Sequence, residues 1–199
     1  MRIAIIDYKA GNTYSVIHAL QRLGAKVELT ADKERIQTAD KVVFPGQGEA
    51  GQAMRYLRSH HLDQVIRDLR QPVLGICIGQ QLLCEWSDEG NTPCLGVFPG
   101  AVVRRFADLW PGAPCKVPHI GWNSIAQPQS ALFKGIEGGE YVYFVHSYCV
   151  PVSPWTIAVT DYVQPFSAAL HRDNFYATQF HPEKSGSVGE RILQNFLDL

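Results

Sequence analysis

Short apolar runs alternate with helix-like segments along the first 86 residues, and this alternation constrains the fold more than any other feature. The apolar runs of strand length are residues 2–7, 26–30, 41–46 and 72–77. Between them, apolar residues recur at the three- and four-residue spacing of an amphipathic helix, as in residues 12–24 and 53–70. Strands and helices that alternate in this way form a parallel sheet covered by helices on both faces. We therefore expect a three-layer α/β fold.

Beyond residue 86 the pattern changes to β-rich segments separated by proline and glycine. These segments are residues 96–106, 115–125, 141–150, 156–162, 167–174 and 175–180. We expect them to form antiparallel strands that extend the sheet in the C-terminal half. Residues 188–199 place Ile192, Leu193, Phe196 and Leu197 on one helical face, which predicts a docked final helix.

Composition limits the function classes. The 199 residues are 46% apolar and 19% charged, which suits a single domain over residues 1–199. A net charge of -1 favours small molecules or protein surfaces over nucleic acid or anionic membranes as partners. No stretch resembles a secretory signal or a membrane span of about 18 apolar residues, so we expect a cytoplasmic protein. The five cysteines form no C-x-x-C pair, which indicates reduced thiols.

One cysteine stands between two glycines where an apolar run meets a helical pattern. The segment GICIG, residues 75–79, is the thiol version of the G-x-S-x-G elbow, in which a sharp turn lifts the central side chain above the sheet. At a helix N-terminus, the free N–H groups and the helix dipole favour the thiolate of Cys77. The alternative is that Cys77 is a small buried hydrophobic residue, and the segment alone favours neither interpretation.

A nucleophilic thiolate needs a proton shuttle and a group that orients the shuttle. His181 and Glu183 stand two residues apart after the apolar segment 175–180, so on an extended backbone they point to the same side. The carboxyl end of this segment is expected beside Cys77. The pair could instead bind a metal or form a solvated turn, and no third ligand at suitable spacing supports a metal.

Acyl chemistry also needs donors for the developing oxyanion. The N–H of Ile78, the residue after the nucleophile, is one candidate. The glycine-rich turn after residues 41–44 supplies others in the N–H groups of Gly46, Gln47 and Gly48. Taken alone, this turn favours an ordinary strand-to-helix connection over an oxyanion site.

The three segments PGQG, GICIGQQ and HPE, in this order, resemble the class I (triad) glutamine amidotransferases over nearly the whole chain. Four further blocks are similar to those of the glutaminase subunits of imidazole glycerol phosphate synthases: residues 7–12, 116–123, 143–148 and 179–186. The block KVPHIGWN is the most specific of them. The resemblance implies a flavodoxin-like sheet extended by antiparallel strands, and glutaminase activity in histidine biosynthesis. It implies no cofactor.

The resemblance also implies roles for individual residues. Cys77 would attack the side-chain amide of glutamine, His181 would transfer protons and Glu183 would orient the imidazole. The residues that resemble glutamine contacts are Gly48, Ile78, Gln81, His146, Ser147 and Tyr148. Structural alternatives remain for Gln81 as a helix-surface amide, His146 as a core histidine and Tyr148 as a packing residue.

A single amidotransferase domain leaves no room for an acceptor site, so ammonia would pass to another protein. The resemblance identifies this partner as a (β/α)8-barrel cyclase that uses a phosphoribulosyl-formimino-aminoimidazole-carboxamide ribonucleotide. The residues expected at or near the docking face are Asn12, Trp122, Asn123, Tyr143 and Lys184. Trp122 could instead be a core aromatic residue. We expect Lys184 to pair with an acidic residue of the cyclase.

Gln47 departs from the small apolar residue that is usual in the family at this position. There, the adjoining peptide is thought to reorient and complete the oxyanion hole once the acceptor is bound to the partner. A glutamine amide could bias either orientation, so the strength of coupling to the partner is open. Two rival functions are a stand-alone γ-glutamyl cysteine hydrolase and a catalytically silent binding protein. Another class I glutaminase is a third alternative.

Overall fold

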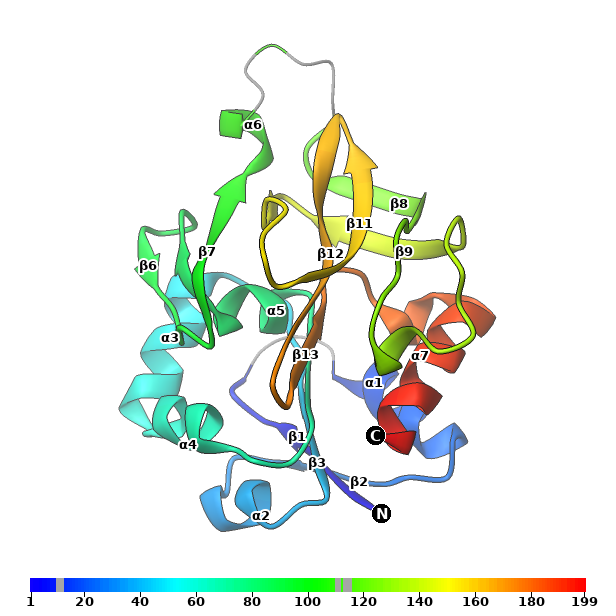
Figure 1. The fold of residues 1–199 in the computed structure, drawn as a ribbon. Helices are drawn as coiled ribbons and strands as arrows, with labels where there is room; N and C mark the ends of the chain where they lie inside the picture. Colours follow the sequence, from blue (N-terminus) through cyan, green and yellow to red (C-terminus); the bar gives the residue numbers. More distant parts are fainter. Residues whose placement is uncertain (10–12, 110–111, 113–115) are drawn as a thin grey trace.

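A seven-stranded sheet forms the centre of the molecule in the computed structural model, which describes residues 1–9, 13–109, 112 and 116–199 (Figure 1). Its strand order is β11-β12-β13-β4-β3-β1-β2. The five parallel strands are β1 (Arg2–Ile6), β2 (Lys26–Thr30), β3 (Lys41–Phe44), β4 (Val73–Ile76) and β13 (Phe175–Thr178). The antiparallel strands β11 (Thr156–Tyr162) and β12 (Gln164–Arg172) extend one edge. The expected α/β fold with an antiparallel extension is confirmed.

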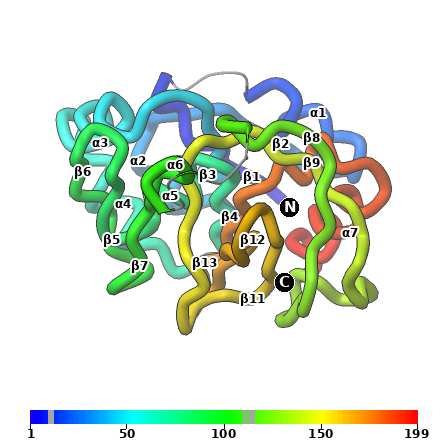
Figure 2. The backbone as a smooth tube through the Cα atoms, turned by 90° about the horizontal axis from the view of Figure 1, so that it is seen from above, coloured from blue at the N-terminus to red at the C-terminus, as the bar shows by residue number. Residues whose placement is uncertain are grey.

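Helices cover both faces of this sheet (Figures 1 and 2). One side carries α2 (Lys33–Gln37), α3 (Ala50–Ser59), α4 (Leu62–Asp68) and α5 (Ile78–Leu83), and the other carries α1 (Tyr14–Arg22) and α7 (Gly186–Asp198). Alternate residues of β1 feed the two cores, because Ala4 and Ile6 pack on one side and Ile3 and Ile5 on the other. Among the residues that the structure describes, no helix is long and apolar enough to cross a membrane.

The β-rich C-terminal half divides among three sheets rather than joining one. A second sheet has the order β10-β7-β5-β6. Its members are β5 (Cys84–Ser87), β6 (Thr92–Pro93), β7 (Phe98–Arg105) and β10 (Tyr148–Cys149). The strands β8 (His119–Ser124) and β9 (Tyr141–His146) pair only with each other within the described ranges. The remaining elements are α6 (Phe106–Leu109) and the 3-10 helices η1 (Ala131–Phe133) and η2 (Pro182–Lys184).

Two local expectations were wrong in detail. The segment 175–180 was expected to run antiparallel, but β13 is parallel to β4. The tight turn after β12 reverses the chain, so a strand that follows an antiparallel neighbour regains the direction of the core strands. The helical pattern over residues 53–70 is also divided, because His61 adopts a left-handed conformation with φ 55° between α3 and α4.

Gly79 allows α5 to pack directly against β3. A Cβ atom at residue 79 would lie 1.9 Å from the carbonyl oxygen of Phe44, and one at Gly75 would lie 2.8 Å from Leu83 Cδ1. Real Cβ atoms do not lie 1.9 Å from a backbone atom, and a Cβ atom at residue 75 would also lie only 3.0 Å from the backbone carbon of Gly79. The two glycines of the elbow therefore serve close packing between strand and helix, as the sequence pattern predicts.

We expect Gly79→Ala to lower the free energy of unfolding by about 3 kcal/mol, since the backbone of β3 cannot move away without disturbing the sheet. Urea titration followed by circular dichroism measures this loss. The control is Gly24→Ala, where φ is +84° but no atom lies within 4 Å of the new Cβ, so only backbone strain of about 1 kcal/mol is added. Equal losses for the two variants would contradict the packing role of Gly79.

Candidate active site

Cys77 lies at a sharp turn between the end of β4 and the start of α5. Its backbone has φ 55° and ψ -108°, a conformation rarely adopted by residues other than glycine. The turn is held in place because the N–H of Cys77 donates a hydrogen bond to the carbonyl oxygen of Thr178 on β13, at 2.7 Å. The side chain is presented at the carboxyl edge of the sheet with 7% of the residue exposed. This is the strained elbow that a presented nucleophile requires.

His181 reaches Cys77 because β13 lies beside β4, with Thr178 paired to Ile76. Its Nδ1 lies 2.7 Å from Glu183 Oε1, and both side chains are 3% exposed. A carboxylate can only accept, so Nδ1 carries the proton and Nε2 is the atom left to react. Within the described ranges, no group of three histidine, cysteine or carboxylate side chains could hold a metal ion.

The charges around His181 favour its protonated form. Burial by itself would lower the pKa of this imidazole, but its interactions with Cys77 and Glu183 outweigh burial and raise the pKa to about 10. Nε2 is buried and makes no hydrogen bond of normal length and angle to a described residue. The contacts of the ring with Cys77 and Glu183 therefore favour the imidazolium form of His181 at neutral pH.

Gln179 is a polar contact of the sulfur that the sequence analysis missed. The residue is completely buried, and its Nε2 lies 3.7 Å from Cys77 Sγ. Its Oε1 accepts a hydrogen bond of 2.9 Å from Gln81 Nε2. Gln179 precedes His181 by two residues in the chain, and this same-side spacing was the signal that could have revealed it.

A cavity of about 370 Å³ opens onto the sulfur of Cys77, and every residue predicted to contact substrate lines it. These are Gly48, Ile78, Gln81, His146, Ser147 and Tyr148. Gln47 and Glu89 also line it. Glu89 was not predicted; burial raises the pKa of its carboxyl, and Oε2 accepts a hydrogen bond of 2.8 Å from the N–H of Ala50. A carboxylate aimed into this cavity suits a cationic group of a ligand.

The predicted oxyanion donors differ in their positions. Gly48, with φ 133°, and Gln47 face the cavity, and neither N–H donates to a described residue. Gly46 lies behind the wall, where a Cβ atom would stand 2.4 Å from Ile78 Cγ2. Tyr8 supports this segment from below, since its hydroxyl donates to the carbonyl of Pro45 at 2.6 Å. Burial, and next the charge of Cys77, raise the pKa of Tyr8.

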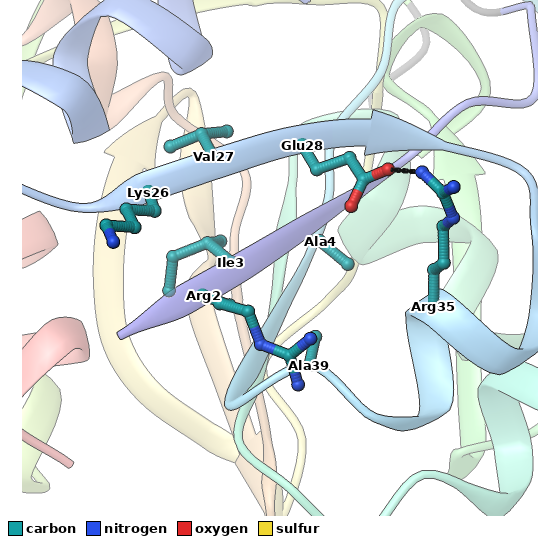
Figure 3. A pocket seen from close by; sticks show the side chains of 8 residues that line it. All are labelled: Arg2, Ile3, Ala4, Lys26, Val27, Glu28, Arg35 and Ala39. Carbon is teal, nitrogen blue, oxygen red and sulfur yellow. Dashed lines mark hydrogen bonds and ion pairs between the residues drawn. The ribbon is translucent and has the colours of Figure 1, made fainter.

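A second cavity is lined by residues of β1, β2 and α2 and shares no residue with the site around Cys77 (Figure 3). Arg2 and Lys26, which begin their parallel strands, line it together with the ion pair of Glu28 and Arg35. In open α/β sheets, ligands bind at the carboxyl ends of the strands. Cys77 is at that end and these residues are not.

The predicted docking residues of β8 differ in exposure. Trp122 is 55% exposed, not a core residue, and its ring packs edge-on against Tyr143 at 5.9 Å. Asn123 is half-buried, and its Nδ2 donates to the carbonyl of Asp161 at 2.9 Å. Lys184 is partly exposed and forms no ion pair with a described residue. Asn12 lies outside the described residues.

Two buried histidines, His119 at the start of β8 and His146 at the end of β9, lie side by side, and His146 also lines the cavity. His119 Nδ1 is 3.0 Å from His146 Nε2, and His146 Nδ1 is 2.7 Å from the carbonyl oxygen of Tyr148. Burial lowers the pKa of His146 to about 3 and that of His119 to about 4, so both rings are neutral at pH 7. Neither ring can act as a cationic contact for substrate.

The family model of glutamine amidotransferase class-I matches residues 4–199. The chain belongs to the class I glutamine amidotransferases. Relatives named imidazole glycerol phosphate synthase subunit HisH match this amidotransferase along its length. The protein of Bacteroides fragilis is 58% identical over 199 residues, with 100% of both chains covered, and that of Escherichia coli is 44% identical over 201 residues, again with 100% of both covered.

The fold comparison agrees with this family assignment. A solved structure of a putative GMP synthase component from Thermoplasma acidophilum superposes with a TM-score of 0.76 at 21% sequence identity. The match covers 100% of this amidotransferase and 92% of that chain. At this identity the likeness concerns the fold alone.

Proposed function

We propose that the chain is the glutaminase subunit of an imidazole glycerol phosphate synthase in histidine biosynthesis. It hydrolyses glutamine to glutamate and ammonia and passes the ammonia to a cyclase subunit. The observation that carries the proposal is the hydrogen-bonded pair of His181 and Glu183 beside the strained elbow of Cys77, in one cavity. Full-length relatives at 44% and 58% identity carry the synthase subunit's name.

The first half of the reaction forms a thioester. The thiolate of Cys77 attacks the side-chain carbonyl carbon of glutamine, and the oxygen that becomes negative is met by the N–H groups of Ile78 and Gly48. As the C–N bond breaks, His181 transfers the Nε2 proton to the nitrogen, which leaves as ammonia. Glu183 holds the ring so that Nε2 faces the reacting atoms.

The second half returns the enzyme to its starting state. His181, now neutral, takes a proton from water at Nε2 while the oxygen attacks the thioester carbonyl. The C–S bond breaks, glutamate is released, and the ring is again positively charged beside the thiolate. The proton given to ammonia is thus replaced by one from water, and no other reactant is needed.

The far end of the cavity suits the α-ammonium group of glutamine. Gln81 uses its Nε2 for the carbonyl of Tyr148, at 3.1 Å, and for Gln179, so its Oε1 remains as an acceptor. Glu89 adds a carboxylate on the same wall. Two acceptors that face one cavity select a cationic amine, and this is the group that distinguishes an amino acid from a simple amide.

An apolar surface on the β8–β9 hairpin supports the proposed docking of the cyclase. Ile120, Trp122 and Tyr141 are 60%, 55% and 60% exposed, and Trp122 stands opposite Tyr143 in the strand register. Exposed aromatic residues clustered on one face are typical of a protein interface. Lys184 follows Glu183 directly and lacks an ion pair within the described part of the chain, which supports its proposed pairing with an acidic residue of the cyclase.

The test is glutamate release by the isolated glutaminase, by its complex with the cyclase, and by that complex with its nucleotide. We expect a low rate for the isolated protein and a large rise with both, because the segment around Gln47 must present its N–H groups to the oxyanion. Equal rates in all three conditions would remove the coupling to the partner while leaving the glutaminase intact. Activity on γ-glutamyl peptides in preference to glutamine would favour the stand-alone hydrolase instead.

A further inference from the structure

A continuous chain of hydrogen bonds joins the strand β8 to the wall of the glutamine cavity. Asn123 Nδ2 lies 3.4 Å from His119 Nε2, His119 Nδ1 lies 3.0 Å from His146 Nε2, and His146 Nδ1 lies 2.7 Å from the carbonyl oxygen of Tyr148. Tyr148 lines the cavity, whereas Asn123 belongs to the hairpin with the exposed aromatic surface. The reaction described above uses neither His119 nor Asn123.

The direction of this chain follows from its last member. A carbonyl oxygen can only accept, so His146 must carry its proton on Nδ1 and accept on Nε2. His119 must then donate from Nδ1 and accept on Nε2, and the group that faces it must be the NH₂ of Asn123. The same NH₂ donates to the carbonyl of Asp161 at 2.9 Å, which fixes the orientation of the amide.

The carbonyl oxygen of Tyr148 also fixes the amide orientations of Gln81 and Gln179, which lie near Cys77. Because this oxygen accepts from Gln81 Nε2 at 3.1 Å, the amide of Gln81 is oriented with its NH₂ toward Gln179 Oε1. Gln179 must therefore turn its own NH₂ toward Cys77 Sγ. One backbone oxygen thus sets the donor that faces the sulfur, and the histidine chain helps to hold that oxygen.

His119 is fixed in the plane that this role requires. Its ring lies between Tyr162, at 3.9 Å and 17°, and Phe144, at 4.9 Å and 22°. The residue is 4% exposed. A ring stacked on both faces cannot rotate out of the plane, so only its nitrogen atoms make polar contacts.

We propose that His119 is a positioning residue for the reaction at Cys77, as the central member of a one-directional chain from Asn123 through His146 to the Tyr148 carbonyl. The role of the nearby surface in docking rests on the proposed function. The chain of hydrogen bonds rests on the geometry alone. Movement of β8 would alter the Tyr148 carbonyl and, through Gln81 and Gln179, the donor beside the sulfur.

The first test compares His119→Phe with His171→Phe in the complex with saturating cyclase and nucleotide. His171 is also stacked on a tyrosine, Tyr176 at 4.1 Å, and bonded to a backbone carbonyl, but it contacts no member of the chain. Phenylalanine keeps the stacking and removes the hydrogen bonds. We expect kcat/KM for glutamine to fall about five- to tenfold in His119→Phe and to change less than about twofold in His171→Phe. Equal effects would overturn the proposal.

The second test separates positioning from general support of the fold. Side-chain ¹⁵N spectra of histidine-labelled protein at pH 7 should show His119 and His146 as neutral Nδ1–H tautomers, assigned through His119→Phe and His146→Asn. In His119→Phe, the Nε2 signal of His146 should move because its hydrogen-bond donor is lost. The free energy of unfolding should stay within about 1 kcal/mol of wild type, which corresponds to less than a tenfold change in the folding equilibrium constant. An Nε2–H tautomer at either ring would overturn the chain.

A double-variant cycle tests whether the residues act in series. Asn123→Ala should lower kcat/KM about two- to threefold in the wild type and have no further effect in His119→Phe, because the chain is already broken there. Independent, multiplied losses would refute a single chain. If the wild-type complex released no glutamate at all, the proposed function would fail, whereas the spectra would still decide the chain.

Discussion

Replacement of Cys77 by alanine is expected to reduce glutamate release by about 10⁴-fold or more, because no other described group can attack the amide carbon from the elbow. The fold should persist, since the side chain is small and its backbone N–H keeps the bond to Thr178. Glutamate release by the complex with cyclase and nucleotide measures the loss, and thermal unfolding verifies the fold. Product formation from added ammonium salt should survive, because the variant lacks only the source of ammonia.

Cys94→Ala is the matched control for this result. Cys94 is a partly exposed thiol whose pKa is raised to about 12 by burial, so it stays protonated and unreactive at neutral pH. Its replacement should leave glutamate release within about twofold of wild type, in the range of a contact remote from the reaction. Retained activity in Cys77→Ala, or a comparable loss in Cys94→Ala, would refute the assignment of the nucleophile.

Glu183→Gln should lower kcat about 10³-fold, although the side chain keeps its size. The carboxylate stabilises the imidazolium and accepts from Nδ1 at 2.7 Å. An amide removes the charge, and its NH₂ can donate to Nδ1 and place the ring in the wrong tautomer. Single-turnover thioester formation with excess enzyme measures this effect directly, since it excludes ammonia transfer and product release.

The charge of Glu183 should also affect how kcat/KM depends on pH. The pKa of His181 is raised to about 10 by Cys77 and Glu183, against the effect of burial. The imidazolium form of His181 therefore persists through neutral pH, and activity should decline only as the pH approaches 10. Loss of the Glu183 charge lowers this pKa, so the alkaline limb of kcat/KM should move to lower pH. An unmoved limb in Glu183→Gln would contradict the electrostatic role.

Local patterns predicted the α/β fold and the turn at Cys77, because these features follow from the periodicity and the glycine spacing of short segments. The GICIG segment specifies its turn through the close approach of Gly79 to the carbonyl of Phe44. His181 reaches Cys77 because β13 and β4 are parallel neighbours, a pairing that places both carboxyl ends together. The turn is encoded within one segment, whereas the pairing of β13 with β4 joins segments that are far apart in the sequence.

Side-chain contacts between distant segments were less accessible from the sequence. Asn123 was expected at the docking face, and nothing in the sequence indicated that its amide contacts Asp161 and His119. Glu89 was missed because it follows β5, whose position depends on the second sheet rather than on its own periodicity. The β-rich segments show the same alternation of apolar and polar residues whichever sheet they join. The pattern therefore predicts strands but not which strands pair with each other.

His181, the proposed catalytic base, shares its backbone support with the β8–β9 hairpin. The N–H of His181 donates to the carbonyl of Tyr143 at 2.9 Å, and Ser185 Oγ, which lies 3.0 Å from the N–H of Tyr143, donates to the carbonyl of His181 at 2.6 Å. The opposite side of Tyr143 carries the exposed ring of Trp122. A displacement of Tyr143 would therefore also move the backbone of His181. A substitution that destabilises β9 is expected to slow proton transfer even where every reacting group is intact.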